Sequence, residues 1–225
     1  MTGYGQTFAL WRDAAGQHWP AYTRHRFVQG LGDGSLPRAA FLDYMVQDYL
    51  FLVHFSRAWA LAVTKAETVD EMRLAAGTVN ALINDEMALH IRSCADLGLT
   101  ESDLFEAEEK PQNIAYTRYV LDAGHAGDFL DLLAALAPCV MGYGEIGARL
   151  KAEARSDAYT DWIATYAAED YQQVCRDVGA LIDTAVTRRL GATAQDSPRW
   201  PALCHRFTTA TRLEVGFWDM GLEAA

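Results

Sequence analysis

The sequence predicts an all-α protein that folds as a single-domain helical bundle. Apolar residues recur at helical spacing along most of the chain, and no run of alternating apolar and polar residues with a hairpin signal indicates a strand. The predicted connections are short, which favours antiparallel neighbouring helices. With 225 residues, 51% of them hydrophobic, the chain can bury one large core. We therefore expect residues 1–225 to form one domain.

Turn and capping signals divide the first part of the chain. An amphipathic helix ends near Pro20, and a glycine-rich turn follows at residues 29–34. A phosphate-binding loop is disfavoured there, because the glycine spacing is wrong and no strand precedes it. Pro37 opens a long helix, and Thr68 with Glu71 forms a capping box for the next one. The helices expected in this part cover residues 7–18, 38–65 and 69–96.

The second part begins with an acidic loop at residues 98–111 that holds one short turn. Asp128 and Ser156 each have the side chain expected of a helix N-cap, and the pair Ser197-Pro198 has the residues expected where the last helix starts. The helices expected in this part cover residues 113–123, 129–154, 157–190 and 199–222.

Composition and charge exclude several classes of protein. The net charge of −11 disfavours nucleic acid or an anionic membrane as the main partner, because both require a basic footprint. The four cysteines form no CxxC pair, the N-terminus lacks the pattern of a secretory signal, and the apolar run at residues 129–144 is too short and interrupted to span a bilayer. We expect a cytoplasmic protein with free thiols.

Pro138 and Cys139 lie within that apolar run, whose only charged residue is Asp131. Proline removes a backbone hydrogen bond and kinks a helix. Tyr143 follows Cys139 by four positions and shares its helical face. A kink beside a thiol and a phenol predicts the wall of a pocket. The alternative is a buried structural cysteine, which is common in protein cores.

Two carboxylates lie on apolar helical faces, Asp48 beside Tyr44 and Phe51, and Glu214 beside Phe217 and Trp218. A carboxylate in such a place must find a partner or shift its pKa. The alternative to a functional site is a structural ion pair. For Asp48 the partner would be an arginine of a neighbouring helix, and for Glu214 it would be Arg212 or Arg206.

Tyr116 and Tyr166 add hydroxyls on apolar faces, where tyrosines are usually core residues. One thiol, two buried carboxylates and several tyrosines together predict a pocket for a flat polar heterocycle. Glu86 and His90 are four positions apart, but no second pair of this kind supplies the further ligands that a metal-binding bundle needs. We expect no metal and no cofactor, and a structural polar pair of Glu86 with His90.

Several short segments follow one another along the chain: FVQGLGDGSLP (27–37), QD (47–48), EMALH (86–90), LAPC (136–139), WIATY (162–166), and Glu214 with Phe217-Trp218. Taken in order, these segments resemble the TenA family (thiaminase II, aminopyrimidine aminohydrolase) of the haem-oxygenase-like superfamily. The resemblance covers residues 27–221 and includes the cysteine of the cysteine-bearing branch. It implies hydrolysis of 4-amino-5-aminomethyl-2-methylpyrimidine or thiamine to the hydroxymethyl pyrimidine used in thiamine salvage. It also implies a homo-oligomer, a tetramer.

The resemblance also implies residue roles. Cys139 is the nucleophile, which adds to the ring carbon adjacent to C5 and helps to expel the group on the exocyclic CH2. Glu214 is the proton donor, and Asp48 accepts hydrogen bonds from the 4-amino group and orients the ring. Tyr143 and Tyr166 match substrate contacts, Tyr116 lines the pocket, and Phe217 with Trp218 supports Glu214.

This chain departs from the family pattern at Phe51, where well-known members have a tyrosine whose hydroxyl helps to activate the cysteine. Phenylalanine cannot donate that hydrogen bond. Gly144 and Asp219 also replace bulkier or apolar neighbours, which predicts a larger pocket or an altered interface. Two other functions therefore stay open: an enzyme of the same fold acting on a different heterocycle, and a non-catalytic pyrimidine-binding or regulatory protein.

Overall fold

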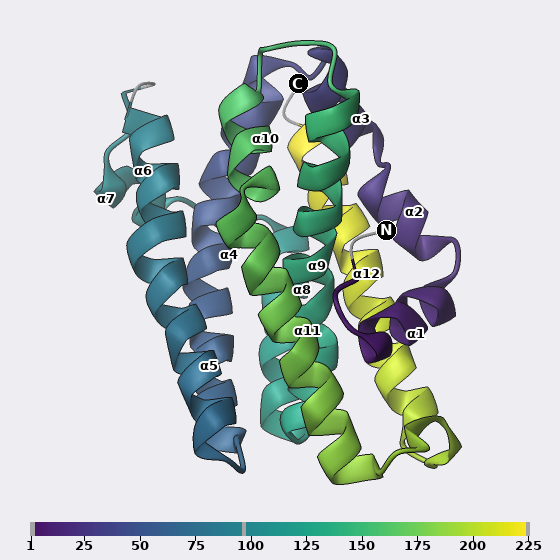
Figure 1. The fold of residues 1–225 in the computed structure, drawn as a ribbon. Helices are drawn as coiled ribbons and strands as arrows, with labels where there is room; N and C mark the ends of the chain where they lie inside the picture. Colours follow the sequence, from purple (N-terminus) through teal and green to yellow (C-terminus); the bar gives the residue numbers. More distant parts are fainter. Residues whose placement is uncertain (1–2, 96–97, 224–225) are drawn as a thin grey trace.

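The computed structural model describes residues 3–95 and 98–223, and within these ranges the chain forms helices and connecting loops with no strand. Figure 1 shows the long helices running roughly side by side, with the short first helices against one flank of the bundle. The elements in order are α1 (Gln6–Ala15), α2 (His18–Thr23), α3 (Arg26–Asp33), α4 (Arg38–Lys65), α5 (Val69–Ala81), the π-helical turn η1 (Leu82–Glu86), α6 (Met87–Ala95), α7 (Glu101–Glu106), α8 (Pro111–Ala126), α9 (Phe129–Glu153), α10 (Thr160–Ala167), α11 (Glu169–Leu190), the 3₁₀ turn η2 (Ala194–Asp196) and α12 (Trp200–Leu222).

Helix α9 is the central helix of the bundle, and it packs against α8, α10, α11 and α12. It continues through Pro138, and most of its side chains are buried. The sequence analysis expected this segment to be too short to span a bilayer, which is wrong for the full helix of 25 residues. However, 83% of its most apolar window is buried inside the fold, as in the core helix of a globular domain.

Several expected elements are confirmed. Helix α4 has the expected bounds, and the capping box of Thr68 with Glu71 begins α5. Asp128 caps α9, where its carboxylate accepts the backbone N–H groups of Leu130 and Asp131. The end of the helix expected over residues 69–96 falls on a residue outside the described ranges.

Three expectations are wrong because local backbone geometry overrides the helical pattern. The helix expected over residues 7–18 is interrupted at Gly16, whose φ of +54° breaks it into α1 and α2. The glycine-rich segment at 29–34 is mostly the helix α3, which ends at Gly34 in the left-handed conformation. The helix expected over 157–190 is interrupted at the extended residue Ala168, and Ser156 accepts the N–H of Ala158 ahead of α10.

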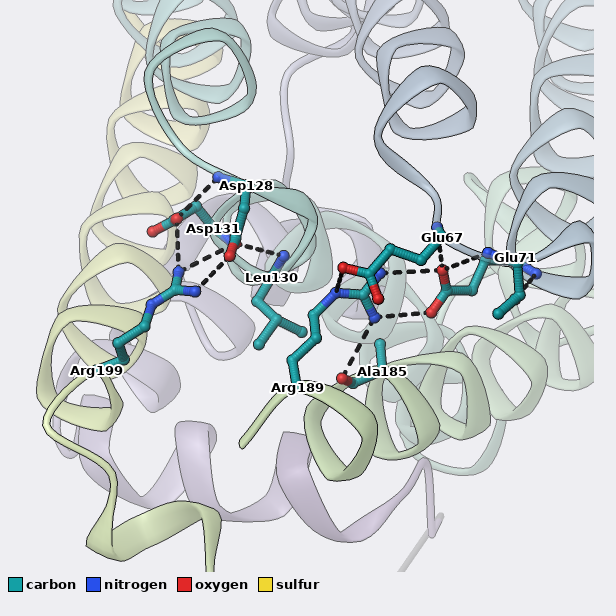
Figure 2. A network of polar contacts seen from close by, with 9 residues as sticks. Glu67, Glu71, Asp128, Leu130, Asp131, Ala185, Arg189 and Arg199 are labelled. Carbon is teal, nitrogen blue, oxygen red and sulfur yellow. Dashed lines mark hydrogen bonds and ion pairs between the residues drawn. The ribbon is translucent and has the colours of Figure 1, made fainter. Parts of the chain in front are cut away.

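Arginines hold the helix ends together at the lower end of the bundle in Figure 1, as the close view in Figure 2 shows. Arg189 of α11 makes two hydrogen bonds of 2.8 and 3.0 Å to Glu71 of α5. Arg199, at the start of α12, binds Asp128 and donates to Asp131 at 2.8 Å. Arg206 donates to the other oxygen of Asp131 at 2.6 Å. We call these residues the arginine network; it ties α5, α9, α11 and α12 together.

Candidate active site

A cavity of about 600 Å³ opens between α4, α5, η1, α9, α10 and α11, and many of its walls are apolar. Its lining includes three of the predicted site residues, Asp48, Cys139 and Tyr143, together with Glu86 and Tyr171. The other predicted residues belong to the layer of buried side chains next to this lining. They are Phe51, Tyr116, Tyr166 and Glu214.

Cys139 follows Pro138 on α9, and its side chain is partly exposed toward the cavity. Burial raises the pKa of the Cys139 thiol well above its usual value, and the charges of Glu214, Glu86 and Asp48 raise it further. A thiolate is therefore disfavoured before substrate binds, because the charges acting most strongly on the sulfur are negative. The sulfur can attack only if a nearby group accepts its proton.

Asp48 is buried on α4 and is held by two donors. His90 approaches its Oδ2 at 2.7 Å through Nε2, and the hydroxyl of Tyr44 donates to the same oxygen at 2.9 Å. Trp162 in turn donates to the Tyr44 hydroxyl at 3.2 Å. The partner from a neighbouring helix is thus present, but it is His90 of α6 and not an arginine. Tyr44 lies four positions before Asp48 on the same helix, so the sequence shows it as a neighbour. His90 lies 42 positions away in the sequence, on another helix.

His90 links the two acidic residues of this wall. Its Nδ1 lies 3.0 Å from the backbone carbonyl of Glu86, and its Nε2 contacts Asp48. A backbone carbonyl and a carboxylate are both acceptors, so this geometry suits a ring with a proton on each nitrogen. Burial alone lowers the pKa of His90, but the hydrogen bond and charge of Asp48 outweigh burial and raise it. The expected side-chain pair of Glu86 with His90 is replaced by this arrangement.

Glu214 is buried on α12, and the hydroxyl of Tyr116 donates to its Oε1 at 2.8 Å. Burial raises the pKa of Glu214 to about 8, against the effect of the Tyr116 hydrogen bond. The side chain is thus protonated near neutral pH and can donate a proton. The expected pairing with Arg212 or Arg206 is wrong, since Tyr116 takes that place and Arg206 binds Asp131 instead.

Glu86 is a cavity residue whose carboxyl the sequence analysis assigned to a structural pair. Tyr166 donates to its Oε1 at 3.1 Å, and burial raises the pKa of Glu86 to about 7. Glu86 ends the π-helical turn η1, an element that interrupts helices and is frequent at functional sites. No residue pattern in the sequence predicted the π-helical turn η1.

Aromatic packing encloses Glu214. The Phe51 ring lies 5.0 Å from the ring of Tyr116 and 5.5 Å from that of Phe217, and Phe51 is only 3% exposed. Trp218 is fully buried, with its ring 5.4 Å from that of Tyr143. Phe51 thus packs in the aromatic layer against Tyr116 and Phe217, the two residues beside Glu214.

The two remaining departures lie away from the cavity lining. A larger pocket at Gly144 is wrong, because an added Cβ would meet the Cys175 sulfur at 2.6 Å and the Tyr4 hydroxyl at 2.9 Å. Asp219 is at the surface and contacts His25 at 3.1 Å. Within the described ranges, no group of three or more His, Cys, Asp or Glu side chains is placed to hold a metal ion.

An all-α bundle that encloses a cavity beside a thiol, two buried carboxyls, one half-buried carboxyl and a tyrosine cluster has the architecture of an enzyme acting on small molecules. The chain belongs to the TENA/THI-4/PQQC family, which residues 12–224 match. It is 35% identical to the aminopyrimidine aminohydrolase of Halalkalibacterium halodurans over 90% of this chain and 89% of that protein. It is 38% identical to an uncharacterized protein of Haemophilus influenzae, over 92% and 95% of the two chains.

A solved structure supports the same conclusion about the fold. The crystal structure of a TenA family transcription regulator from Silicibacter sp. TM1040 is 61% identical and superposes with a TM-score of 0.96, covering 97% of each chain. The expected family and its helical fold are therefore confirmed.

Proposed function

We propose that this protein hydrolyses thiamine-derived aminopyrimidines. The substrate would be 4-amino-5-aminomethyl-2-methylpyrimidine or thiamine, and the product the hydroxymethyl pyrimidine of thiamine salvage. The observation that carries the proposal is a cavity in which Cys139 lies among carboxyls that are held protonated or hydrogen-bonded. The names of relatives support it, since the proteins of Halalkalibacterium halodurans and Bacillus subtilis are aminopyrimidine aminohydrolases.

Asp48 orients the ring in this proposal. Its carboxylate is fixed by His90 and Tyr44, and it also lines the cavity, where it can accept the 4-amino group of the pyrimidine. A carboxylate whose position is fixed by two donors loses little entropy when it binds. Tyr143 offers a hydroxyl and a ring face in the same cavity, and Tyr166 supports the wall behind it.

The sulfur of Cys139 forms a bond to the ring carbon adjacent to C5 while protonated Glu214 gives its proton to a ring nitrogen. The added electron density at C5 then expels the amine or thiazole from the exocyclic CH2. Water adds to the resulting methylene. The C–S bond then breaks, the ring nitrogen returns its proton to Glu214, and the sulfur regains a proton, which restores the aromatic ring and the thiol. The covalent adduct divides one difficult displacement into easier steps.

The first test incubates the purified protein with each substrate and follows hydroxymethyl pyrimidine by chromatography. We expect product from the wild type and a loss of about 10⁴-fold in Cys139→Ser, because a hydroxyl is a far poorer nucleophile near neutral pH. Full activity in that variant would contradict the covalent mechanism. Turnover of neither substrate would favour a different heterocycle, and binding that survives Cys139→Ala without any turnover would favour a regulatory pyrimidine-binding protein.

We also propose a cytoplasmic homotetramer, as the resemblance implies. Apolar side chains exposed along α5 and η1 support an association surface: Val69 is 65%, Met72 39% and Ile83 51% exposed.

A further inference from the structure

Glu86 has no part in the scheme above, although it is a half-buried carboxyl on the wall of the same cavity. It ends η1, the only π-helical turn within the described residues, where the backbone departs from regular α-helix between α5 and α6. The carboxyl is fixed by the 3.1 Å hydrogen bond from Tyr166 of α10. A side chain presented in this way by an irregular turn is a candidate for a chemical role.

Glu86 and Glu214 reach the site from different parts of the bundle. Glu86 comes from the junction of α5 and α6, at one flank of the bundle in Figure 1. Glu214 comes from α12, which packs against α9, the helix that carries Cys139. The charges of both carboxyls act on Cys139. The sulfur therefore has two different acids near it, and each can serve a different proton transfer.

When Cys139 attacks, its thiol proton must pass to a neighbouring group. Most of the groups near the sulfur are unsuitable as acceptors of this proton. Asp48 already accepts hydrogen bonds from His90 and Tyr44. Glu214 must carry a proton in order to protonate the ring, so it cannot take another. Tyr166 and Tyr171 have pKa values well above the usual value through burial and are poor bases in their neutral form. Glu86 is the carboxylate left for this task.

We propose that Glu86 is a second catalytic carboxyl, which takes the thiol proton of Cys139 and gives it to the leaving amine. This role rests on the proposed function. As the S–C bond forms, the proton moves from sulfur to Glu86; as the C–N bond breaks, the same proton moves to nitrogen and ammonia leaves. Glu86 then takes a proton from the attacking water and returns it to the sulfur when the C–S bond breaks.

The surroundings of Glu86 suit a group that alternates between two protonation states. The groups facing it are Asp48 of α4, His90 of α6 and Tyr166 of α10. Burial raises the pKa of Glu86 to about 7, while the positive charge of His90 opposes that effect and the negative charge of Asp48 adds to it. A pKa near the working pH is the best compromise for a group that must both accept and donate a proton.

The first experiment measures alkylation of Cys139 by iodoacetamide against pH, with the modified peptide quantified by mass spectrometry. Glu86→Gln keeps the shape and an acceptor for Tyr166 but removes the charge, so we expect the alkylation midpoint to fall by about 0.5–1 pH unit. Asp122→Asn removes a solvent-exposed carboxylate of α8 that lies outside the cavity lining, and it should leave the midpoint unchanged. An unchanged midpoint in Glu86→Gln would place Glu86 too far from the sulfur and overturn the proposal.

The second experiment compares kcat for two leaving groups. The aminomethyl substrate needs a proton on its leaving nitrogen, whereas the thiazole of thiamine leaves as a neutral molecule without one. In Glu86→Gln we expect kcat to fall at least about 100-fold on the aminomethyl substrate and clearly less on thiamine, while Asp122→Asn, outside the cavity lining, keeps wild-type rates. Equal losses on both substrates would overturn proton delivery to the amine.

Folding and function are controlled separately. Binding of the hydroxymethyl pyrimidine product, measured by calorimetry, should have a similar Kd in Glu86→Gln and wild type; a loss of binding would indicate a structural role and count against the proposal. Wild-type protein that turns over neither substrate would overturn the proposed function itself. An active wild type with an equally active Glu86→Gln would overturn only the role of Glu86.

Discussion

Carboxyl groups occupy two contrasting regions of this bundle, the arginine network at one end and the cavity in the middle. In the network, Arg189 lowers the pKa of Glu71 through its hydrogen bonds. Burial raises the pKa of Asp128, but hydrogen bonds led by that from Arg199 lower it to about 2. At the cavity, Glu86 of the lining and Glu214 of the layer behind it are bound by tyrosine hydroxyls instead of arginines, and burial raises their pKa values to about 7 and 8.

The contrast teaches that the partner, and not the carboxyl itself, decides what such a group does. An arginine keeps a carboxylate ionised and turns it into a stabilising link between helices. A buried carboxyl with only a neutral donor keeps its proton near neutral pH and can transfer it. The network therefore serves the fold, and the cavity holds the groups proposed for chemistry at some cost in stability.

The largest effect that the comparison predicts is on the proposed proton donor. Glu214→Gln cannot donate a proton to the ring, so kcat should fall by about 10²–10⁴-fold. In the wild type, activity should decline as the pH rises through about 8, where Glu214 loses its proton. Steady-state kinetics between pH 6 and 10 measure both. A flat alkaline limb in the wild type would contradict the role.

The same substitution should stabilise the fold. The pKa of Glu214 is raised above its unfolded value of 4.5, so the unfolded chain loses this proton first and stability falls as the pH rises from about 4.5 to 8. Glutamine does not titrate. Glu214→Gln should thus gain at least about 1 kcal/mol over wild type at pH 8, and less at pH 5, in urea melts. A variant less stable at pH 8 would break the contrast between the regions.

An arginine of the network should behave in the opposite way. Arg189→Met keeps most of the apolar stem but leaves Glu71, whose side chain is 3% exposed, without its cation. Breaking such a buried pair should cost about 3 kcal/mol in the free energy of unfolding without affecting the cavity. The matched control is Arg176→Met, whose partner Glu169 is 81% exposed, and it should change stability by less than about 0.5 kcal/mol. Similar losses in the two variants would contradict the prediction.

The smallest effect concerns the missing hydroxyl of the cavity. Phe51→Tyr adds a donor beside Tyr116 and should raise kcat/KM several-fold if that hydroxyl limits the reactivity of Cys139. The alkylation midpoint of Cys139 should fall in parallel. The added atom must fit a position only 3% exposed, so a stability loss of about 1 kcal/mol accompanies it. An unchanged rate would contradict the idea that the hydroxyl absent at Phe51 limits the reactivity of Cys139.

The sequence determined the elements that depend on local interactions. A capping box needs only residues three positions apart, so the starts at Thr68 and Asp128 were predicted correctly. The bounds of α4 followed from Pro37 and an unbroken apolar pattern. The interruptions at Gly16 and Ala168 and the π turn at 82–86 were missed, because packing against other helices selects them over a continuous helix of the same residues.

For the proposed site, apolar surroundings and the family resemblance pointed to Asp48, Cys139 and Glu214, but the arginine partners considered for the two carboxylates are not the ones observed. The residues that bind the two carboxylates, His90 and Tyr116, lie 42 and 98 positions away. An apolar face shows that a carboxyl will be buried, since burial follows from the periodicity of its own helix. Whether a histidine, a tyrosine or an arginine meets that carboxyl depends on how separate helices pack, and only the tertiary structure decides it. Because that partner sets the pKa, the fold alone separated the carboxyls that hold the bundle together from those that can move a proton.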